Sequence, residues 1–224
     1  MVTDMYSTFL QLLDGFKYTL IIFGATLLFS IPLGLLVAKG RMSRNRIVSG
    51  LIRLYISVMR GTPLMLQLMV VYFGPYFLFN ISLRDLTIGN VDYRVTATII
   101  GFSVNYAAYF AEIFRGGIQS IPKGQYEAAQ LLGFTRSQTF FRIVLPQVIK
   151  NVLPSVTNEI ITLVKDTSLA QVLAVTEMFT AAKGQASSQS SIMPLVMAGV
   201  FYYVMNGIIE IIMNRTERKL NYYN

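Results

Sequence analysis

Residues 127 to 146 read EAAQLLGFTRSQTFFRIVLP, and this polar stretch interrupts an otherwise very hydrophobic chain. Glu127 and the two alanines after it favour a helix, since Ala has a high helix propensity and an acid in the first turn complements the helix dipole. Gly133 is small enough to let the helix end or to let another backbone approach. Pro146 suits the first position of a following helix, where its missing N–H costs nothing. The stretch predicts a polar helix over about residues 124–142, with apolar side chains that could fill a partner's groove.

The composition is that of a membrane protein. Of the 224 residues, 54% are hydrophobic and 13% are charged, and this charged share is about half of what a soluble domain shows. The length suits one domain, so residues 1–224 are assigned to a single transmembrane unit. An apolar helix of roughly 20 residues crosses the hydrocarbon, whereas the strands of a closed barrel would be shorter. We therefore predict an all-α fold with about five transmembrane helices, over about residues 16–38, 61–80, 95–114, 146–164 and 192–213.

Three segments around these spans are harder to interpret. The fourth span is broken by Lys150 and Glu159. Residues 4–15 fit either a short helix lying in the membrane interface or the extended start of the first span. Residues 168–182 are interpreted as a partly buried helix that does not cross the membrane.

Several classes of function are excluded by residues that the chain lacks. It has no Cys and no His, so disulfides, thiol nucleophiles, Cys/His zinc sites and serine–histidine triads are ruled out. It also lacks a phosphate-binding Gly-x4-Gly-Lys-Ser/Thr run. We expect no catalytic residue, no metal site and no enzyme activity. The net charge of +8 is explained by basic loops beside apolar spans, so no nucleic-acid partner is expected.

The basic residues predict the orientation of the chain in the membrane. With the N-terminus outside and the C-terminus in the cytoplasm, the cytoplasmic pieces are residues 39–60, 115–150 and the tail from 214. They hold 14 of the 19 Lys and Arg residues, and such an excess marks cytoplasmic loops. The outer pieces hold Lys17, Arg84, Arg94, Lys165 and Lys183. This orientation places the predicted helix at 124–142 in the cytoplasm.

The stretch at 127 to 146 resembles the EAA signature of ABC-importer permeases, E-A-A-x3-G-x9-I-x-L-P, and matches it at every specified position. Three further segments resemble the polar amino-acid uptake branch of that family: RGTP at 60–63, YFAEIFRGGIQSIPKGQ at 109–125 and NEIITLVKDTSL at 158–169. Together the motifs cover the second to the fourth predicted span. The first and fifth spans match only in hydropathy and order.

The resemblance implies a type I ABC importer permease in the cell membrane of a prokaryote, surrounded by membrane lipid. It implies a cytoplasmic coupling helix that docks two ABC ATPase subunits, and those subunits would bind ATP and Mg²⁺. It also implies a second permease subunit, most simply an identical copy in a homodimer, and an extracellular or periplasmic amino-acid-binding protein. The implied docking residues are Glu127, Ala128, Ala129 and Gly133 of the motif and Leu132, Phe134 and Arg136 beside them.

Polar residues inside the spans predict a passage for substrate. A charged group at mid-bilayer costs about 2.5–3.5 kcal/mol on insertion scales and usually faces protein or water. The fourth span carries a polar stripe at helical spacing, and the third carries a narrower one. In the functional interpretation these stripes line a passage and bind an amino acid through Asn105, Glu112, Ser155, Asn158, Glu159 and Thr162.

A structural interpretation of the same acids competes with the functional one. The acids could instead pair with Lys or Arg and hold helices together. Arg115 lies one turn from Glu112 and favours pairing there, whereas no basic residue lies three or four positions from Glu159. Acids without partners would suit a cationic amino acid, but an α-amino group would serve equally well.

We expect an ATP-driven importer of polar amino acids that works by alternating access. ATP would close the partner ATPases, and its greater affinity for the closed form would drive the shift. One alternative is a secondary transporter or channel that uses Glu159 as a proton or ion site. Another is a scaffold that holds a membrane complex together without transporting anything.

Overall fold

The computed structural model describes residues 2–83, 86–87 and 91–220, and within this part of the chain it consists of helices joined by turns, without a β-sheet. Arg84, which was assigned to an outer loop, lies outside the described residues. The α-helices are α1 (Val2–Arg41), α2 (Arg46–Gly61), α3 (Leu64–Phe79), α4 (Tyr93–Gln119), α5 (Lys123–Leu131), α6 (Arg136–Gln138), α7 (Leu145–Asp166), α8 (Met178–Ser188) and α9 (Met193–Leu220). A π-helical segment η1 (Thr139–Val144) precedes α7, and a 3₁₀ helix η2 (Thr167–Leu173) follows it.

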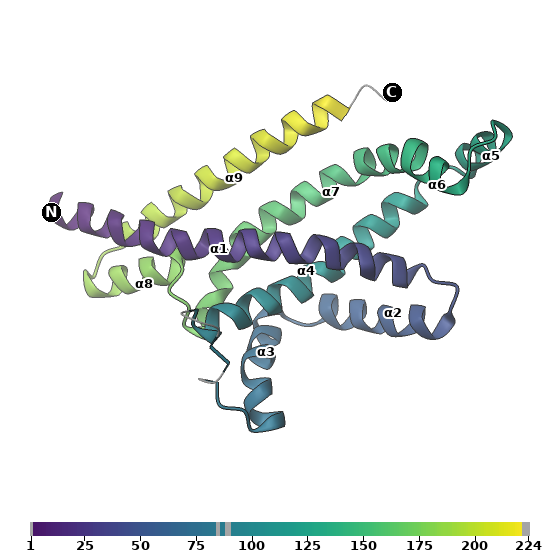
Figure 1. Cartoon of the computed structure of the whole chain (residues 1–224). Helices are drawn as coiled ribbons and strands as arrows, with labels where there is room; N and C mark the ends of the chain where they lie inside the picture. The colour runs from purple at the N-terminus through teal and green to yellow at the C-terminus, as the bar shows by residue number, and fades with distance from the viewer. Residues whose placement is uncertain (1, 84–85, 88–90, 221–224) are drawn as a thin grey trace.

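The long helices α1, α4, α7 and α9 run roughly along one direction, with α5 and α6 at one end and α8 at the other (Figure 1). Because α1 and α9 enter from the same end, the N-terminus and the end of α9 lie at opposite ends of the molecule. α4 is the central helix, since 61% of its most apolar stretch is buried inside the protein, compared with 28% for the corresponding stretch of α1 and 11% for that of α9.

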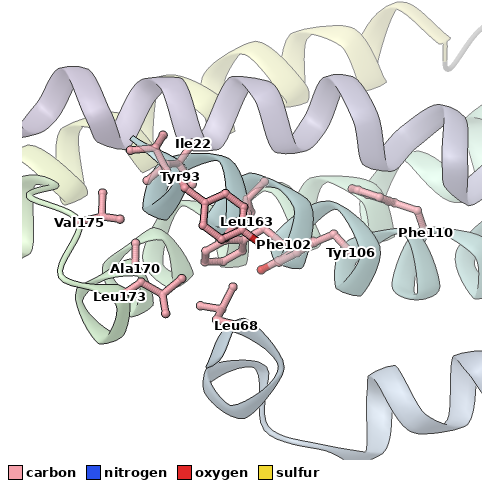
Figure 2. Close-up of a cluster of buried hydrophobic side chains, with 12 residues drawn as sticks. Ile22, Leu68, Tyr93, Phe102, Tyr106, Phe110, Leu163, Ala170, Leu173 and Val175 are labelled. Carbon is pink, nitrogen blue, oxygen red and sulfur yellow. The ribbon is translucent and has the colours of Figure 1, made fainter. Parts of the chain in front are cut away.

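The core is built around α4. Phe102, Tyr106 and Phe110 of α4 meet side chains from α1, α3, α7 and η2 (Figure 2). α1 crosses α4 so closely that a Cβ on Gly34 would lie 2.9 Å from the Cβ of Phe110, so this position requires glycine. The helix that carries the central polar residues is therefore held on several sides.

Among the described residues, three helices are long and apolar enough to cross a membrane, namely Met5–Arg41 in α1, α4 and α9. They correspond to the first, third and fifth predicted spans. α7 lies where the fourth was expected, but it is not among these apolar helices. Its polar stripe lowers its hydropathy, and a charged or polar face inside a membrane usually faces protein or water.

The second predicted span corresponds to a broken helix pair. α2 and α3 are long and apolar enough to cross a membrane only when they are taken together as one span. The two helices are bent by 112° at Thr62 and Pro63. A proline lacks the N–H that would continue the helix, so a break there is expected. One span was predicted over residues 61–80, and the helix at Arg46–Gly61 was not foreseen.

Two other expectations need correction. Residues 4–15 are part of α1 and do not form a separate interfacial helix, so the extended start of the first span is the correct alternative. Residues 168–182 were expected to form one helix, but they divide into η2 and the first part of α8. The division falls at Ala174, whose φ of 54° is left-handed and ends the 3₁₀ helix.

Candidate functional site: an exposed elbow and a polar membrane cluster

The predicted polar helix at 124–142 is in fact two helices joined by a tight turn, which we call the α5–α6 elbow (residues 123–144). α5 ends at Leu131, and the turn that follows contains Gly133, whose φ is +77°. The N–H of Gly133 donates to the carbonyl of Gln130, and the N–H of Phe134 donates to the carbonyl of Ala129, both over 3.0 Å. This pair of bonds is a Schellman motif, which satisfies the last carbonyls of a helix and needs a residue that tolerates a left-handed backbone. The single helix was therefore a wrong expectation, although a role for Gly133 in ending a helix was foreseen.

The second half of the elbow is continuous with α7. Thr135 begins α6 with a capping box, in which its hydroxyl accepts from the N–H of Gln138 and the Gln138 side chain accepts from the N–H of Thr135. α6, η1 and α7 then follow one another without a non-helical residue. A displacement of α6 would therefore reach α7 through unbroken helical backbone.

The elbow exposes large apolar side chains. Leu131 is 89% exposed, Leu132 76% and Phe141 62%. Scattered surface leucines are ordinary, but neighbouring, almost fully exposed ones at the end of a polar helix indicate a surface that another protein covers. A hollow of about 570 Å³ lies beside them, lined by Tyr126, Gln130, Phe134, Thr135, Arg136, Thr139 and Phe140.

The predicted docking residues fall into two groups in the elbow. Glu127, Ala128, Leu132, Gly133 and Arg136 are exposed, whereas Ala129 is only 1% exposed and Phe134 is half-buried. Ala129 and Phe134 are the two residues that close the Schellman motif, so they shape the turn from inside. Leu131, the most exposed large apolar side chain of the elbow, was not among the predicted docking residues.

Asn105 holds the bend between α2 and α3. Its side chain is 3% exposed, and its Nδ2 donates to the carbonyl of Met59 over 3.0 Å and to Oε1 of Gln67 over 2.9 Å. Gln67 in turn donates to the hydroxyl of Thr62 over 2.8 Å. These bonds satisfy polar groups that the break leaves free inside an apolar environment.

Glu112 is paired with arginine. Its carboxylate lies 2.5 Å from Nη2 of Arg115 and 3.9 Å from Nε of Arg41. A cavity of about 400 Å³ lies beside it, to which Ser155 and Asn151 of α7 also contribute. The structural interpretation therefore holds for the charge of Glu112, although its side chain still borders open space.

The polar stripe of α7 lies on an uncovered face. Asn158 and Thr162 are exposed, as are Asn151, Ser155 and Lys165, which share that face at spacings of three or four residues. Glu159 lies at the edge of the stripe and is half-buried. An uncovered polar face on a helix within the bundle must meet water or another protein chain.

A second set of residues gathers where α2 and α7 meet α4, and we call it the lumen cluster: Arg60, Tyr106, Tyr109, Glu159 and Asp166. The Arg60 guanidinium lies over the Tyr109 ring, 5.3 Å from its centre. The charge of Arg60 acts on both Glu159 and Glu112. The Tyr106 hydroxyl donates to the Asp166 carboxylate over 2.7 Å. Arg60 was missed because it is far from Glu159 along the chain, and α2 packs against α4 only in the folded protein.

Two further carboxylates cap helices near the opposite end of the bundle. Glu177 is fully buried at the start of α8 and accepts from the N–H groups of Phe179 and Thr180, both over 2.7 Å, and from the Tyr202 hydroxyl over 3.1 Å. Asp92 caps α4 and accepts from the backbone N–H of Arg94 over 2.8 Å and from its Nε over 2.9 Å. These hydrogen bonds from Arg94 lower the pKa of the Asp92 carboxyl.

An all-helical membrane domain with an exposed, signature-bearing elbow that leads into a polar helix defines the membrane permease of an ABC importer. The family model for the inner membrane component of binding-protein-dependent transport systems matches residues 30–222. The chain belongs to this family, whose members work with a substrate-binding protein and a separate ATPase subunit.

Relatives and a solved structure agree with this assignment. The arginine transport system permease protein ArtQ of Bacillus subtilis (strain 168) is 36% identical over 210 residues, which cover 93% of this chain and 92% of the relative. The L-cystine transport system permease protein TcyB of the same organism is 33% identical over 211 residues, covering 93% and 86%. The crystal structure of an amino acid ABC transporter with histidines matches with a TM-score of 0.84 at 29% identity, covering 97% of both chains.

Proposed function

We propose that this chain is the permease subunit of an ATP-driven importer of amino acids, and that the α5–α6 elbow is the surface on which the ATPase docks. One observation carries the proposal: Leu131 and Leu132 are 89% and 76% exposed at a turn that Gly133 fixes in a left-handed conformation. A rigid turn that presents bare apolar side chains fits the groove of a partner protein. The named relatives support the amino-acid substrate, since they are permeases for arginine and for L-cystine.

The charges of the elbow indicate what the docking surface of the ATPase should be like. Lys123, Arg136 and Arg142 outnumber the single acid Glu127 between residues 123 and 144. The ATPase should therefore present an apolar groove with a predominantly acidic rim. ATP and Mg²⁺ would bind to the ATPase, and this chain would receive only the resulting motion.

The path of the motion is short. ATP-driven closure of two ATPase subunits would pull the two elbows together, and the continuous helix from Arg136 to Asp166 would carry that movement to the α7 stripe. The bundle would then alternate between openings toward the two sides of the membrane. The shift is driven by the differential affinity of ATP for the closed form.

Substrate recognition is assigned to the lumen cluster and the α7 stripe. Arg60 suits the α-carboxylate of an amino acid, since guanidinium groups pair well with carboxylates. Glu159 suits the α-ammonium group, with Ser155, Asn158 and Thr162 beside it on the stripe. Asp166 adds a second carboxylate, which would favour a cationic side chain such as that of arginine or lysine. Asn105 is assigned a structural role at the α2–α3 bend. Glu112 is assigned a structural role as the ion-pair partner of Arg115 and Arg41.

Two copies of the chain are needed to enclose such a passage. The α7 stripe is uncovered, and α3 exposes large apolar residues such as Phe77, Leu78 and Phe79. A homodimer that faces two α7 stripes toward each other would place both clusters beside one aqueous space. The excess of Lys and Arg beside the elbow supports a cytoplasmic elbow and an outer N-terminus.

The test is uptake by the complete transporter with its ATPase in proteoliposomes, in the presence of the binding protein. The double substitution Leu131→Ala and Leu132→Ala should abolish ATP-driven uptake and copurification of the ATPase. Leu28→Ala is the matched control, since Leu28 is 68% exposed on α1, away from the elbow, and it should leave both unchanged. Uptake that follows an ion gradient in vesicles without ATPase would instead support a secondary transporter based on Glu159 and would overturn the proposal.

A further inference from the structure

The first two helices carry an unbalanced positive charge. Residues 15–83 contain no Asp or Glu, but they contain Lys17, Lys39, Arg41, Arg44, Arg46, Arg53 and Arg60. Two of these cations lie in the last turn of α1, where the helix dipole favours them. Arg41 also faces Glu112, and Arg60 covers Tyr109. No such contact accounts for Arg44, Arg46 and Arg53.

These three arginines are exposed, and in the described part of the chain no carboxylate lies within ion-pair distance of any of them. Arg46 and Arg53 share one face of α2, because seven residues are close to two helical turns. Arg44 precedes the helix in the turn from α1. Three like charges with no internal counter-charge favour binding of an external anion.

An apolar stripe lies next to the arginines on α2. Ile47, Leu51, Leu54 and Val58 recur every three or four residues and are 73%, 64%, 61% and 44% exposed. The opposite face of α2 is the one that packs, through Ile56 and its neighbours, against α1 and α4. From Ile47 to Val58 the stripe is about 16 Å long at the rise of an α-helix, which matches one leaflet of a hydrocarbon core about 30 Å thick.

The stripe ends in an apolar hollow. α2 runs back alongside the bundle from the α1–α2 turn, and α3 then turns away from it (Figure 1). Inside this bend lies a cavity of about 320 Å³. Its walls include Val58 from the end of the stripe, Leu66 and Val70 from α3, and Val104 from α4. Cationic groups, a stripe of one-leaflet length and an apolar hollow thus follow one another along α2.

We propose that α2 binds one anionic phospholipid of the cytoplasmic leaflet. Arg44 and Arg46 hold its headgroup phosphate, and Arg53 reaches toward the headgroup with its charged end while its stem lies along the helix. One acyl chain lies along Ile47, Leu51 and Leu54 and ends in the hollow beside Val58. The site rests on the proposed orientation, in which the α1–α2 turn faces the cytoplasm. Charge complementarity selects an anionic lipid over a second copy of this chain, whose own α2 is equally basic.

The absence of cysteine from the chain allows a clean test. A single Leu54→Cys variant is labelled with a fluorophore, and the transporter with its ATPase is reconstituted in nanodiscs. Quenching by brominated phosphatidylglycerol is then compared with quenching by brominated phosphatidylcholine at the same mole fraction. The control is Ile208→Cys, since Ile208 is 54% exposed on α9, and that helix ends with Arg215, Arg218 and Lys219, among which lies one acid, Glu217.

The proposal predicts that brominated phosphatidylglycerol quenches the fluorophore at Leu54→Cys about fivefold more effectively than brominated phosphatidylcholine does. A preference of this size corresponds to the attraction of roughly one cation to an anionic membrane surface. The preference should fall to that of Ile208→Cys when Arg44→Gln and Arg46→Gln are added, and should weaken at high salt. Equal quenching by the two lipids, or an equal preference at the two positions, would overturn the proposal. So would a lack of quenching by either lipid, because a protein chain would then cover the stripe. The readout needs neither transport nor ATP hydrolysis, so it is independent of the proposed function.

Discussion

The α5–α6 elbow and the α2–α3 bend are both breaks between helices, but they are stabilised in opposite ways. The elbow is closed by backbone bonds around Gly133 and exposes its apolar side chains. The bend is closed by the side chains of Asn105, Gln67 and Thr62 and is partly buried against α4. A break in contact with water needs little internal support, whereas a break inside a membrane must satisfy every freed polar group. The elbow is therefore suited to a partner, and the bend to holding its position.

The largest expected effect on stability comes from removing the amide that holds the bend. Asn105→Leu leaves Oε1 of Gln67 without its donor, and it removes one of the two hydrogen bonds to the Met59 carbonyl, to which Gln67 also donates. It should cost about 1–3 kcal/mol of stability, the usual penalty for buried polar groups left unsatisfied. Unfolding of the purified protein in detergent, followed by circular dichroism, measures the loss. A stability equal to that of the unmodified protein would show that Asn105 does not hold the bend.

The second prediction concerns the left-handed glycine that closes the elbow. Gly133→Val places a β-branched residue at a φ of +77°, where no atom surrounds the added Cβ, so strain alone opposes it. ATP-driven uptake should be lost, while the unfolding midpoint stays close to that of the unmodified chain. Gly133→Asn is the control and should restore part of the uptake, because Asn tolerates a left-handed backbone. Normal uptake by the valine variant would remove Gly133 from the coupling path.

The third prediction concerns the carboxylate of Glu159 on α7, which lies near the charge of Arg60. Glu159→Gln keeps the shape of the side chain but removes its negative charge from the vicinity of Arg60. Substrate affinity should fall about tenfold or more, since hydrogen bonds to charged groups contribute about 1.5–3 kcal/mol. Calorimetric titration of the purified permease with arginine measures the change. Glu210→Gln on α9 is the control, and equal losses in both variants would contradict a specific role for Glu159.

The smallest effect is expected at a helix start that is neither bend nor elbow. The hydrogen bonds from Arg94 lower the pKa of Asp92, so the stabilisation from this cap is present above the unfolded pKa of about 3.9. It is lost as the pH falls through the lowered folded value. Unfolding midpoints between neutral pH and about pH 3 should drop more for the unmodified chain than for Asp92→Asn, which caps without titrating. Parallel curves for the two proteins would show that the cap does not titrate in this way.

The sequence predicted much of the fold but less of the site. The fold class, the helices at four of the five predicted spans and the location of the elbow follow from hydropathy and from the motif around Gly133. The broken span did not, because α2 is too amphipathic to read as apolar and its bend depends on Asn105 of a different helix. Arg60 was missed as a partner of Glu159, and the buried cap at Glu177 was missed too. Both depend on contacts between helices, which periodicity within one segment does not reveal.

The central claim is that the elbow faces the cytoplasm and is covered by an ATPase. Leu131→Cys introduces one thiol into a chain without cysteine, at a side chain that is 89% exposed. A membrane-impermeant maleimide should label it in inverted membrane vesicles stripped of ATPase and not in intact spheroplasts, and adding the ATPase back should protect it. Labelling from the outer face, or labelling that the ATPase leaves unchanged, would contradict the account.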